Sequence, residues 1–309
     1  ASVLHGTPFW FTHAEKLTRN SESEIVLAKN IPEDIFHNIT DEREKICGLS
    51  FDIPRVMGIL NVTPDSFSDG GRYSTLKTAT EHCISMVSAG ADIIDIGGES
   101  TRPGALEVET SEEKSRLIPV IDKIANEIAV PISADTRKSE VAKMAISAGA
   151  ALVNDISGLT FDSKMGDFCI EHNVPVCIMH SRGIPETMQN EPKYNDVCLD
   201  IYDFLSQQIE NLVNSGMQRK AIIVDPGIGF GKSLKHNLSL LRKISLFHGL
   251  GAPILIGLSR KKFVKTLAGL EENEDRMSGS ISVALYARSQ GVQIFRVHDV
   301  KETVQAMKL

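Results

Sequence analysis

Acidic and amide side chains stand where several short apolar runs of this chain end. Asp135 and Asp225 each follow such a run directly, and Asn154 follows another. A buried carboxylate beside a carboxamide can recognise the donor-rich edge of a heterocycle, and Asp225 can accept two hydrogen bonds from an amidine-like edge. Taken singly, Asp135 fits a helix N-cap and Asn154 a turn residue equally well. Both interpretations stay open from these residues alone.

Positive side chains gather after the last two apolar runs. Residues 259–262 read Ser-Arg-Lys-Lys, and Arg296 and His298 alternate along a predicted strand. Alternate strand residues point the same way, which a shared anion would explain. Barrel enzymes often bind phosphate beside the loops after their last two strands. A solvated helix start is the alternative interpretation of residues 260–262.

Three motifs combine glycines with polar residues. Residues 57–71 (MGILNVTPDSFSDGG) pass from an apolar run to a polar loop that begins at Asn61. Residues 97–104 (GGESTRPG) and 225–232 (DPGIGFGK) follow two further runs. The last motif has neither dinucleotide-binding nor P-loop spacing. Phe230 within it either covers an aromatic substrate or is ordinary packing.

Met179 and His180 end another apolar run. Met179 is either a core residue or a soft, polarisable face for a flat ring. His180 lacks a nearby histidine or carboxylate at ligand spacing, which disfavours a metal-binding role.

The elements that position these residues follow a strict alternation. Eight short apolar runs are separated by segments with helical periodicity, which predicts parallel strands joined by helices. The runs are residues 56–60, 91–96, 131–134, 151–153, 175–179, 221–224, 253–258 and 293–297. The helical segments include residues 75–89, 111–127, 138–148, 194–214 and 278–289. Eight such units predict an α/β fold, a (β/α)8 TIM barrel.

An open, doubly wound sheet is the alternative fold. It is disfavoured because polar motifs follow nearly every predicted strand, whereas such a sheet gathers them at one switch point. The barrel is expected to span residues 55–309. Residues 1–54 form a predicted N-terminal extension, in which residues 21–34 supply an extra strand or helix packed on the barrel.

Composition excludes several classes of protein. The chain of 309 residues is 42% hydrophobic and 24% charged, as in ordinary globular proteins. Its formal net charge of -7 argues against general affinity for nucleic acid. We find neither an apolar run of about 18 residues nor a secretory signal, so no membrane association is expected. Five cysteines without a CxxC pair predict free thiols and a cytoplasmic location.

With these motifs in order, the chain resembles the dihydropteroate synthase family. The resemblance rests on NVTPDSFSDGG, GGESTRPG, DPGIGFGK, SRK and RVHDV, and it covers residues 56–300. It implies condensation of (7,8-dihydropterin-6-yl)methyl diphosphate with 4-aminobenzoate, which gives 7,8-dihydropteroate and diphosphate for folate biosynthesis. It also implies a sulfonamide target and a homodimer.

The resemblance assigns a role to each matched position. The implied pterin-binding residues are Asp135, Asn154, Met179, Asp225, Lys261 and Arg296. The implied diphosphate-binding residues are Asn61, Thr101, Arg296 and His298, with Asn61 also holding Mg²⁺. The implied aminobenzoate-binding residues are Arg102, Pro103, Phe230 and Ser259. The implied catalytic residues are Asp135, Lys261, Arg296 and His298.

Charge placement then favours a dissociative, SN1-like route. Mg²⁺, Arg296 and His298 would stabilise the departing diphosphate, and Asp135 would stabilise the cation left on the exocyclic carbon. The motifs offer anion and heterocycle contacts but no pair of nucleophile and base. Ser181, Arg182 and Lys262 depart from the family pattern, which puts local loop contacts in question.

Two alternatives share part of the pattern. A methyltetrahydrofolate-binding, methyltransferase-type barrel has the pterin-reading acids but should not need RVHDV or GGESTRPG. A non-catalytic pterin-binding paralogue is disfavoured because Asn61, Thr101, Lys261, Arg296 and His298 occur together.

Overall fold

Parallel strands form the centre of the computed structural model, which describes residues 1–4, 7–63, 72–100, 104–183, 192–271 and 274–309. In these residues eight strands share one sheet: β5 (Arg55–Asn61), β6 (Ile93–Gly97), β7 (Ile132–Asp135), β8 (Leu152–Asp155), β9 (Val176–Met179), β10 (Ile222–Asp225), β11 (Leu255–Gly257) and β12 (Ile294–Val297). The sheet order is β10, β9, β8, β7, β6, β5, β12, β11. A parallel bridge between Val224 and Ile254 joins its two ends. The predicted barrel is therefore confirmed, and the open sheet is excluded.

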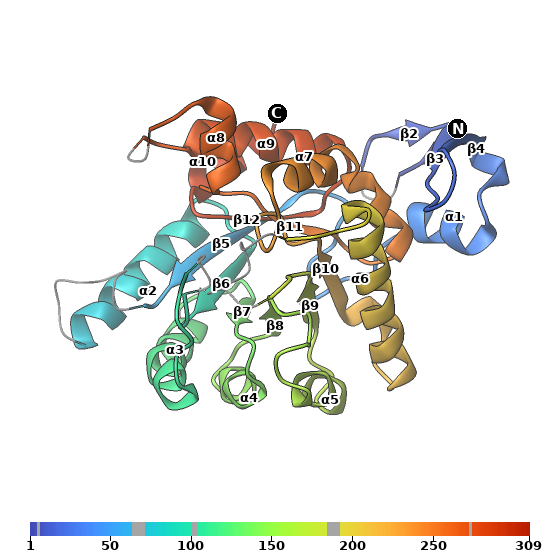
Figure 1. Ribbon diagram of the computed structural model, residues 1–309. Helices are drawn as coiled ribbons and strands as arrows, with labels where there is room; N and C mark the ends of the chain where they lie inside the picture. The colour runs from blue at the N-terminus through green and yellow to red at the C-terminus, as the bar shows by residue number, and fades with distance from the viewer. Residues whose placement is uncertain (5–6, 64–71, 101–103, 184–191, 272–273) are drawn as a thin grey trace.

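Helices surround this sheet and alternate with its strands (Figure 1). They are α2 (Arg72–Ser88), α3 (Thr110–Ala125), α4 (Ser139–Ser147), α5 (Lys164–Glu171), α6 (Val197–Asn214), α7 (Leu234–Arg242), α8 (Lys262–Ala268), α9 (Met277–Ser289) and α10 (Val300–Met307), with 3-10 helices η3 (Arg219–Ala221) and η4 (Ile244–Leu250). Helix α6 begins later than predicted because the Asp196 side chain caps it, accepting from the N–H groups of Cys198 and Leu199. Because η3 includes Ala221, β10 also begins one residue late.

Side chains inside the barrel form two layers, because alternate residues of a strand face opposite sides of the sheet. The layer near the amino ends of the strands is apolar: Met57, Ile93, Leu152, Cys177, Ile223, Leu255 and Ile294. Two residues further along, four of these strands carry Asp95, Asn154, Asp225 and Arg296. The charged and amide side chains of these strands therefore lie toward the carboxyl end of the barrel, where barrel enzymes hold their active sites.

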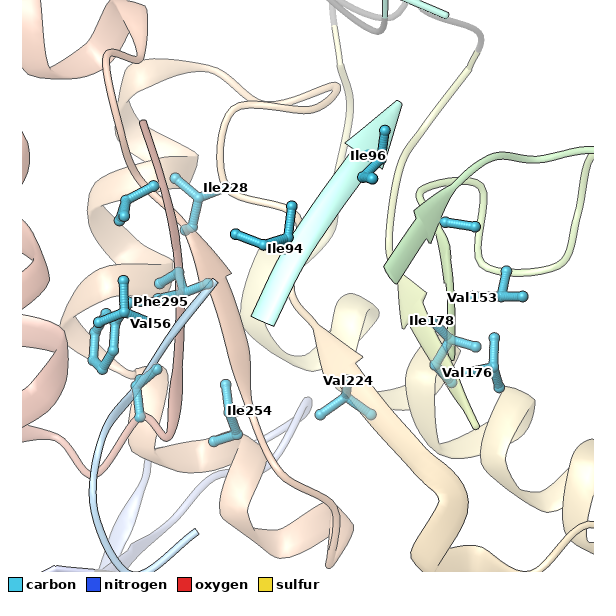
Figure 2. Packing of buried hydrophobic residues seen from close by; sticks show 14 of the residues in the cluster. Val56, Ile94, Ile96, Val153, Val176, Ile178, Val224, Ile228, Ile254 and Phe295 are labelled. Carbon is cyan, nitrogen blue, oxygen red and sulfur yellow. The ribbon is translucent and has the colours of Figure 1, made fainter. Parts of the chain in front are cut away.

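The opposite faces of the strands pack against the helices. Figure 2 shows part of this outer core, including Ile94, Val153 and Phe295. Leu117 and Ile121 of α3 belong to the same cluster and are fully buried. This continuous apolar shell fixes the strand positions, and hence the spacing of the polar groups at their ends.

Residues 1–54 contain short elements before the barrel: β1 (Ser2–Val3), β2 (Trp10–Phe11), β3 (His13–Lys16), β4 (Glu24–Leu27), η1 (Ala28–Asn30) and α1 (Glu33–Thr40). The strands pair antiparallel, β1 with β2 and β3 with β4. Helix α1 attaches to η4, where the Asn38 side-chain amide donates to the Gly249 carbonyl at 2.9 Å. The division of the chain at residue 54 stays a prediction.

The end of this leading segment covers the amino-terminal mouth of the barrel. Ile46 and Phe51 belong to the apolar layer inside the barrel, and Phe51 is 1% exposed. The barrel interior is thus completed by residues that precede its first strand.

We expect Phe51→Ala to lower the free energy of unfolding by about 3–5 kcal/mol, because it leaves a cavity beneath the barrel. Urea denaturation would measure the change. Ile53→Ala is the matched control, since Ile53 is 53% exposed. If the two variants lose equal stability, Phe51 does not complete the interior.

Candidate functional site

Arg296 of β12 joins two buried aspartates at the carboxyl end of the barrel. Its Nε atom lies 2.6 Å from Asp95 Oδ2, and its Nη2 atom lies 2.6 Å from Asp135 Oδ2. Asn154 donates from Nδ2 to the same Asp95 oxygen at 3.2 Å. Asp95, Asp135 and Asn154 are all buried. Four strands, β6, β7, β8 and β12, therefore contribute to one polar cluster.

One guanidinium serves two carboxylates here, and this affects their protonation. Burial raises the pKa of Asp135 to about 8, because it removes the carboxylate from water. The positive charge of Arg296 opposes that rise, while the neighbouring Asp95 adds to it. Two carboxyl groups therefore share one guanidinium, and Asp135 favours a bound proton or a further positive charge beside it.

Asp225 and Lys261 form a second part of the site. Asp225 accepts a hydrogen bond from the Gly227 N–H at 2.7 Å, and burial raises the pKa of its carboxyl against the opposing charge of Lys261. Lys261 donates to the Ile228 carbonyl, and its Nζ atom lies 4.3 Å from the centroid of the Phe230 ring. Burial lowers the pKa of Lys261 to about 8, and the charge of Asp225 partly offsets this effect.

The loop after β10 packs directly on the loop after β9. Gly227 has a φ of +69°, and a Cβ atom there would lie 1.9 Å from the His180 carbonyl oxygen and 3.2 Å from Met179 Cγ. Lys232 is buried, and its Nζ atom lies 3.0 Å from His180 Nδ1. Gly227 and Lys232 thus hold the loops after β9 and β10 together, and Met179 packs beside Gly227.

His180 is a packing residue in this arrangement. Burial and the charge of Lys232 lower the pKa of His180 to about 2, so the ring is neutral. The ring packs edge-on against Phe204 at 5.0 Å between centroids. Among the residues that the structure describes, no group of three or more His, Cys, Asp or Glu side chains is placed to hold a metal ion.

The structure also locates the predicted anion and aminobenzoate residues. Ser259 Oγ lies 3.0 Å from His298 Nδ1 and accepts from the His298 backbone N–H at 3.2 Å. Ser259 therefore lies at the predicted phosphate contact. Arg260 pairs with Asp299 instead, with its Nη2 atom 2.5 Å from the carboxylate. The predicted residues Thr101, Arg102 and Pro103 lie outside the described residues.

Each of the other predicted site residues lies at the carboxyl end of a strand or in the loop that follows. Asn61 ends β5, Asp135 ends β7, Asn154 lies in β8, Met179 ends β9, Asp225 ends β10, Phe230 follows β10, Lys261 follows β11 and Arg296 lies in β12. The recorded contacts join Asp135 and Asn154 through Arg296 and Asp95, and they join Lys261 to the loop after Asp225. Asn61 is half-buried at the rim.

Sequence reasoning missed Asp95. Its signal is an acid within an otherwise apolar strand, two residues after the inward-facing Ile93 and therefore also inward-facing. It also missed a buried ion-pair network around Glu99. Glu99 lies 3.0 Å from Arg137 and 3.3 Å from Lys138, whose Nζ atom is 2.6 Å from Glu113. The segment before residue 101 is anchored by these pairs.

Comparison with known proteins gives consistent matches. Residues 57–298 match the family described as pterin binding enzyme. Dihydropteroate synthase of Escherichia coli K12 is 47% identical over 264 residues, which cover 85% of this chain and 93% of that protein. The Bacillus subtilis dihydropteroate synthase is 47% identical over 254 residues, or 82% and 86% of the two chains.

Solved structures agree with these relatives. A Xanthomonas albilineans dihydropteroate synthase with 4-aminobenzoic acid is 42% identical with a TM-score of 0.81, covering 86% of this chain and 96% of that chain. The same enzyme in complex with 7,8-dihydropteroate has a TM-score of 0.76 at 40% identity, with 84% and 93% coverage. A Yersinia pestis dihydropteroate synthase in a sulfonamide drug complex has a TM-score of 0.80 at 46% identity, covering 86% and 96%.

The half-buried Lys261 gives a test that depends on pH. Its pKa is about 8 in the folded protein and near the ordinary 10.5 in the unfolded chain. Between these values the unfolded chain binds the additional proton, so the free energy of unfolding rises with pH. In urea denaturation, we expect the free energy of unfolding of wild type minus that of Lys261→Met to increase as the pH is raised from 8 to about 10.5.

Lys262→Met is the control, because Lys262 is the next residue in the chain and its side chain is exposed. Its difference from wild type should show no such rise. A wild-type advantage over Lys261→Met that falls across the same pH range would contradict the lowered pKa of Lys261.

Proposed function

Because this chain belongs to the pterin-binding enzyme family, we propose that its buried acid cluster binds the pterin in the dihydropteroate synthase reaction. That reaction joins (7,8-dihydropterin-6-yl)methyl diphosphate to 4-aminobenzoate and releases diphosphate. One observation carries the assignment to this site: Asp135, Asn154 and Asp225 are buried on β7, β8 and β10 at the carboxyl end of one barrel. A pterin presents a row of N–H donors that such acceptors match.

In the proposed complex, Asp225 accepts two hydrogen bonds from the amidine-like edge of the pterin. Asp135 and Asn154 contact the remaining polar edge, and Lys261 donates to a ring acceptor. Met179 and Arg296 lie on either side of the ring plane. The depth of these groups supports this role, because hydrogen bonds to buried charged groups discriminate strongly between ligands.

Asn61, His298 and Thr101 are the proposed contacts to the diphosphate, with Arg296 beside them. Asn61 fits a Mg²⁺ ion as well, since it offers a hard carboxamide oxygen at the rim and Mg²⁺ retains several waters and substrate oxygens. When bound, Mg²⁺ would neutralise charge on the diphosphate. The Ser259 hydroxyl orients the His298 ring for the same anion, in addition to its proposed place near 4-aminobenzoate with Arg102, Pro103 and Phe230.

The proposed chemistry is dissociative. The bond from the exocyclic carbon to the diphosphate oxygen breaks, and its electron pair leaves with the diphosphate, stabilised by Arg296 and His298. The carbon becomes cationic beside Asp135, and that positive charge favours the ionised carboxylate despite its raised pKa. The nitrogen lone pair of 4-aminobenzoate then forms the new C–N bond, and the proton of the resulting ammonium passes to water or to the released diphosphate. Lys261 holds the pterin in place throughout.

Location and assembly are proposed on separate grounds. No helix in the described residues is both long and apolar enough to cross a membrane. All five cysteines are free thiols, which supports the proposed cytoplasmic location. A homodimer is proposed from the family resemblance, and sedimentation equilibrium would test it.

Purified protein should form dihydropteroate and diphosphate from the pterin diphosphate, 4-aminobenzoate and Mg²⁺. We expect Asp225→Asn to lower kcat/KM for the pterin diphosphate by about 10- to 100-fold, because a buried charged acceptor is lost. Asp122→Asn, an exposed change on α3, is the control. Absence of both products from the wild-type reaction would leave the methyltransferase-type barrel or the non-catalytic paralogue as the better description.

Chelation of Mg²⁺ with EDTA should abolish turnover, and added Mg²⁺ should restore it. Asn61→Ala should raise the Mg²⁺ concentration needed for half-maximal rate by about 10-fold, because one protein ligand is lost. The exposed Asn126→Ala provides the control for loss of an amide. An unchanged Mg²⁺ requirement in Asn61→Ala would remove Asn61 from the metal site.

A further inference from the structure

Asp95 lies at the centre of the polar layer without being one of the proposed substrate contacts. Its side chain is completely buried in β6. A single oxygen, Oδ2, receives both the Arg296 Nε–H at 2.6 Å and the Asn154 amide at 3.2 Å. The other oxygen, Oδ1, has no hydrogen-bond partner among the described residues. Burial of this carboxylate therefore carries a large desolvation penalty, which only two hydrogen bonds among the described residues offset.

Packing alone does not require an acid at this position. At the same level of the barrel interior, β5 carries Ile59, β9 carries Met179 and β11 carries Gly257. A buried ion pair generally contributes no more stability than apolar groups of the same volume. The presence of Asp95 is better explained by what it does to its two partners.

Arg296 pairs with two carboxylates, of which only Asp135 is a proposed substrate contact. In the proposed function, Asp135 must turn its acceptors to the pterin and to the cation that forms there. The Asp95 contact to Nε does not compete with substrate, because Asp95 is fully buried and is not one of the proposed substrate contacts. Arg296 can thus keep its plane while Asp135 changes partners.

Asn154 is oriented by the same oxygen. A carboxylate only accepts hydrogen bonds, so the Asn154 NH2 group must face Asp95, and its carbonyl oxygen must face away. That orientation presents Asn154 to a ligand as an acceptor, which suits the N–H donors of a pterin. With a neutral amide at position 95, both orientations of Asn154 would be satisfied.

We propose that Asp95 is a positioning residue that fixes the Arg296 plane and the Asn154 amide orientation, and so sets the specificity of the pocket for the donor edge of the pterin. The inference rests on the proposed pterin site. It assigns Asp95 no contact with the substrate.

Asp95→Asn keeps the shape but removes the charge. We expect its Kd for the pterin diphosphate, measured without 4-aminobenzoate, to rise about 10-fold or more. The KM for 4-aminobenzoate should stay within about 2-fold, because its proposed contacts lie elsewhere. In the Asp95→Asn/Asn154→Ala double variant, Kd should rise by less than the product of the two single-variant factors, since both changes act on one contact. Asp95→Ser should show the same selective loss if Asp95→Asn folds poorly.

Asp155→Asn is the matched control. Asp155 is an equally buried aspartate on β8 that accepts from Ser157 and Leu159. We expect it to lower the melting temperature while the folded fraction keeps wild-type pterin affinity. A positioning role for Asp95 also predicts loss of the slowly exchanging Arg296 Nε–H signal in ¹⁵N NMR of Asp95→Asn, a readout that needs no substrate.

Wild-type pterin affinity in Asp95→Asn, or loss of active protein with unchanged Kd and KM, would overturn the inference. If Asp225→Asn loses affinity while Asp95→Asn keeps it, the proposed function stands and the role of Asp95 fails. If wild-type protein forms no dihydropteroate and does not bind the pterin diphosphate, the proposed function fails, whatever the Arg296 signal shows.

Discussion

The ion pairs of Arg296 with Asp95 and Asp135 determine how the rest of the polar layer can act. Two carboxylates share one guanidinium in a buried place, where charge is poorly solvated. Burial, with a further contribution from the charge of Asp95, raises the pKa of Asp135, so a nearby donor or positive charge would stabilise its ionised form. A ligand with N–H donors and a developing positive charge supplies the missing interactions. The buried carboxylates therefore favour binding of such a ligand over others.

The polar layer depends on a stable apolar layer toward the amino ends of the strands. Met57, Cys177 and the other inward residues fill the amino half of the barrel, and Ile46 and Phe51 cover its amino-terminal mouth. Helices pack on the outer face of the same strands (Figure 2). Stability and chemistry are therefore separated along the strand axis, which is the general division in barrel enzymes.

Loop packing sets the outer limits of the site. Gly227 allows the loop after β10 to approach the His180 carbonyl, and the buried Lys232 contacts both that carbonyl and the His180 ring. Lys261 reaches into this loop and lies over Phe230. These contacts combine backbone carbonyls and a glycine with the Lys232 and Lys261 side chains, so both chain geometry and side-chain identity fix the position of this loop.

The amino-acid sequence by itself determined the barrel and most of the strand ends that carry the chemistry. Periodicity is local, so the alternation of apolar runs and helical segments could be read directly, and Asp135, Asn154, Asp225 and Arg296 could be placed at strand ends. The tertiary structure alone decided which of these groups meet. Asp95 escaped notice because one acid in an apolar run gives little local signal, and its partner Arg296 is 201 residues away. The pairing of Ser259 with His298 and the closure of the barrel by Phe51 were likewise invisible, because burial and charge compensation arise only when distant segments share one dry interior.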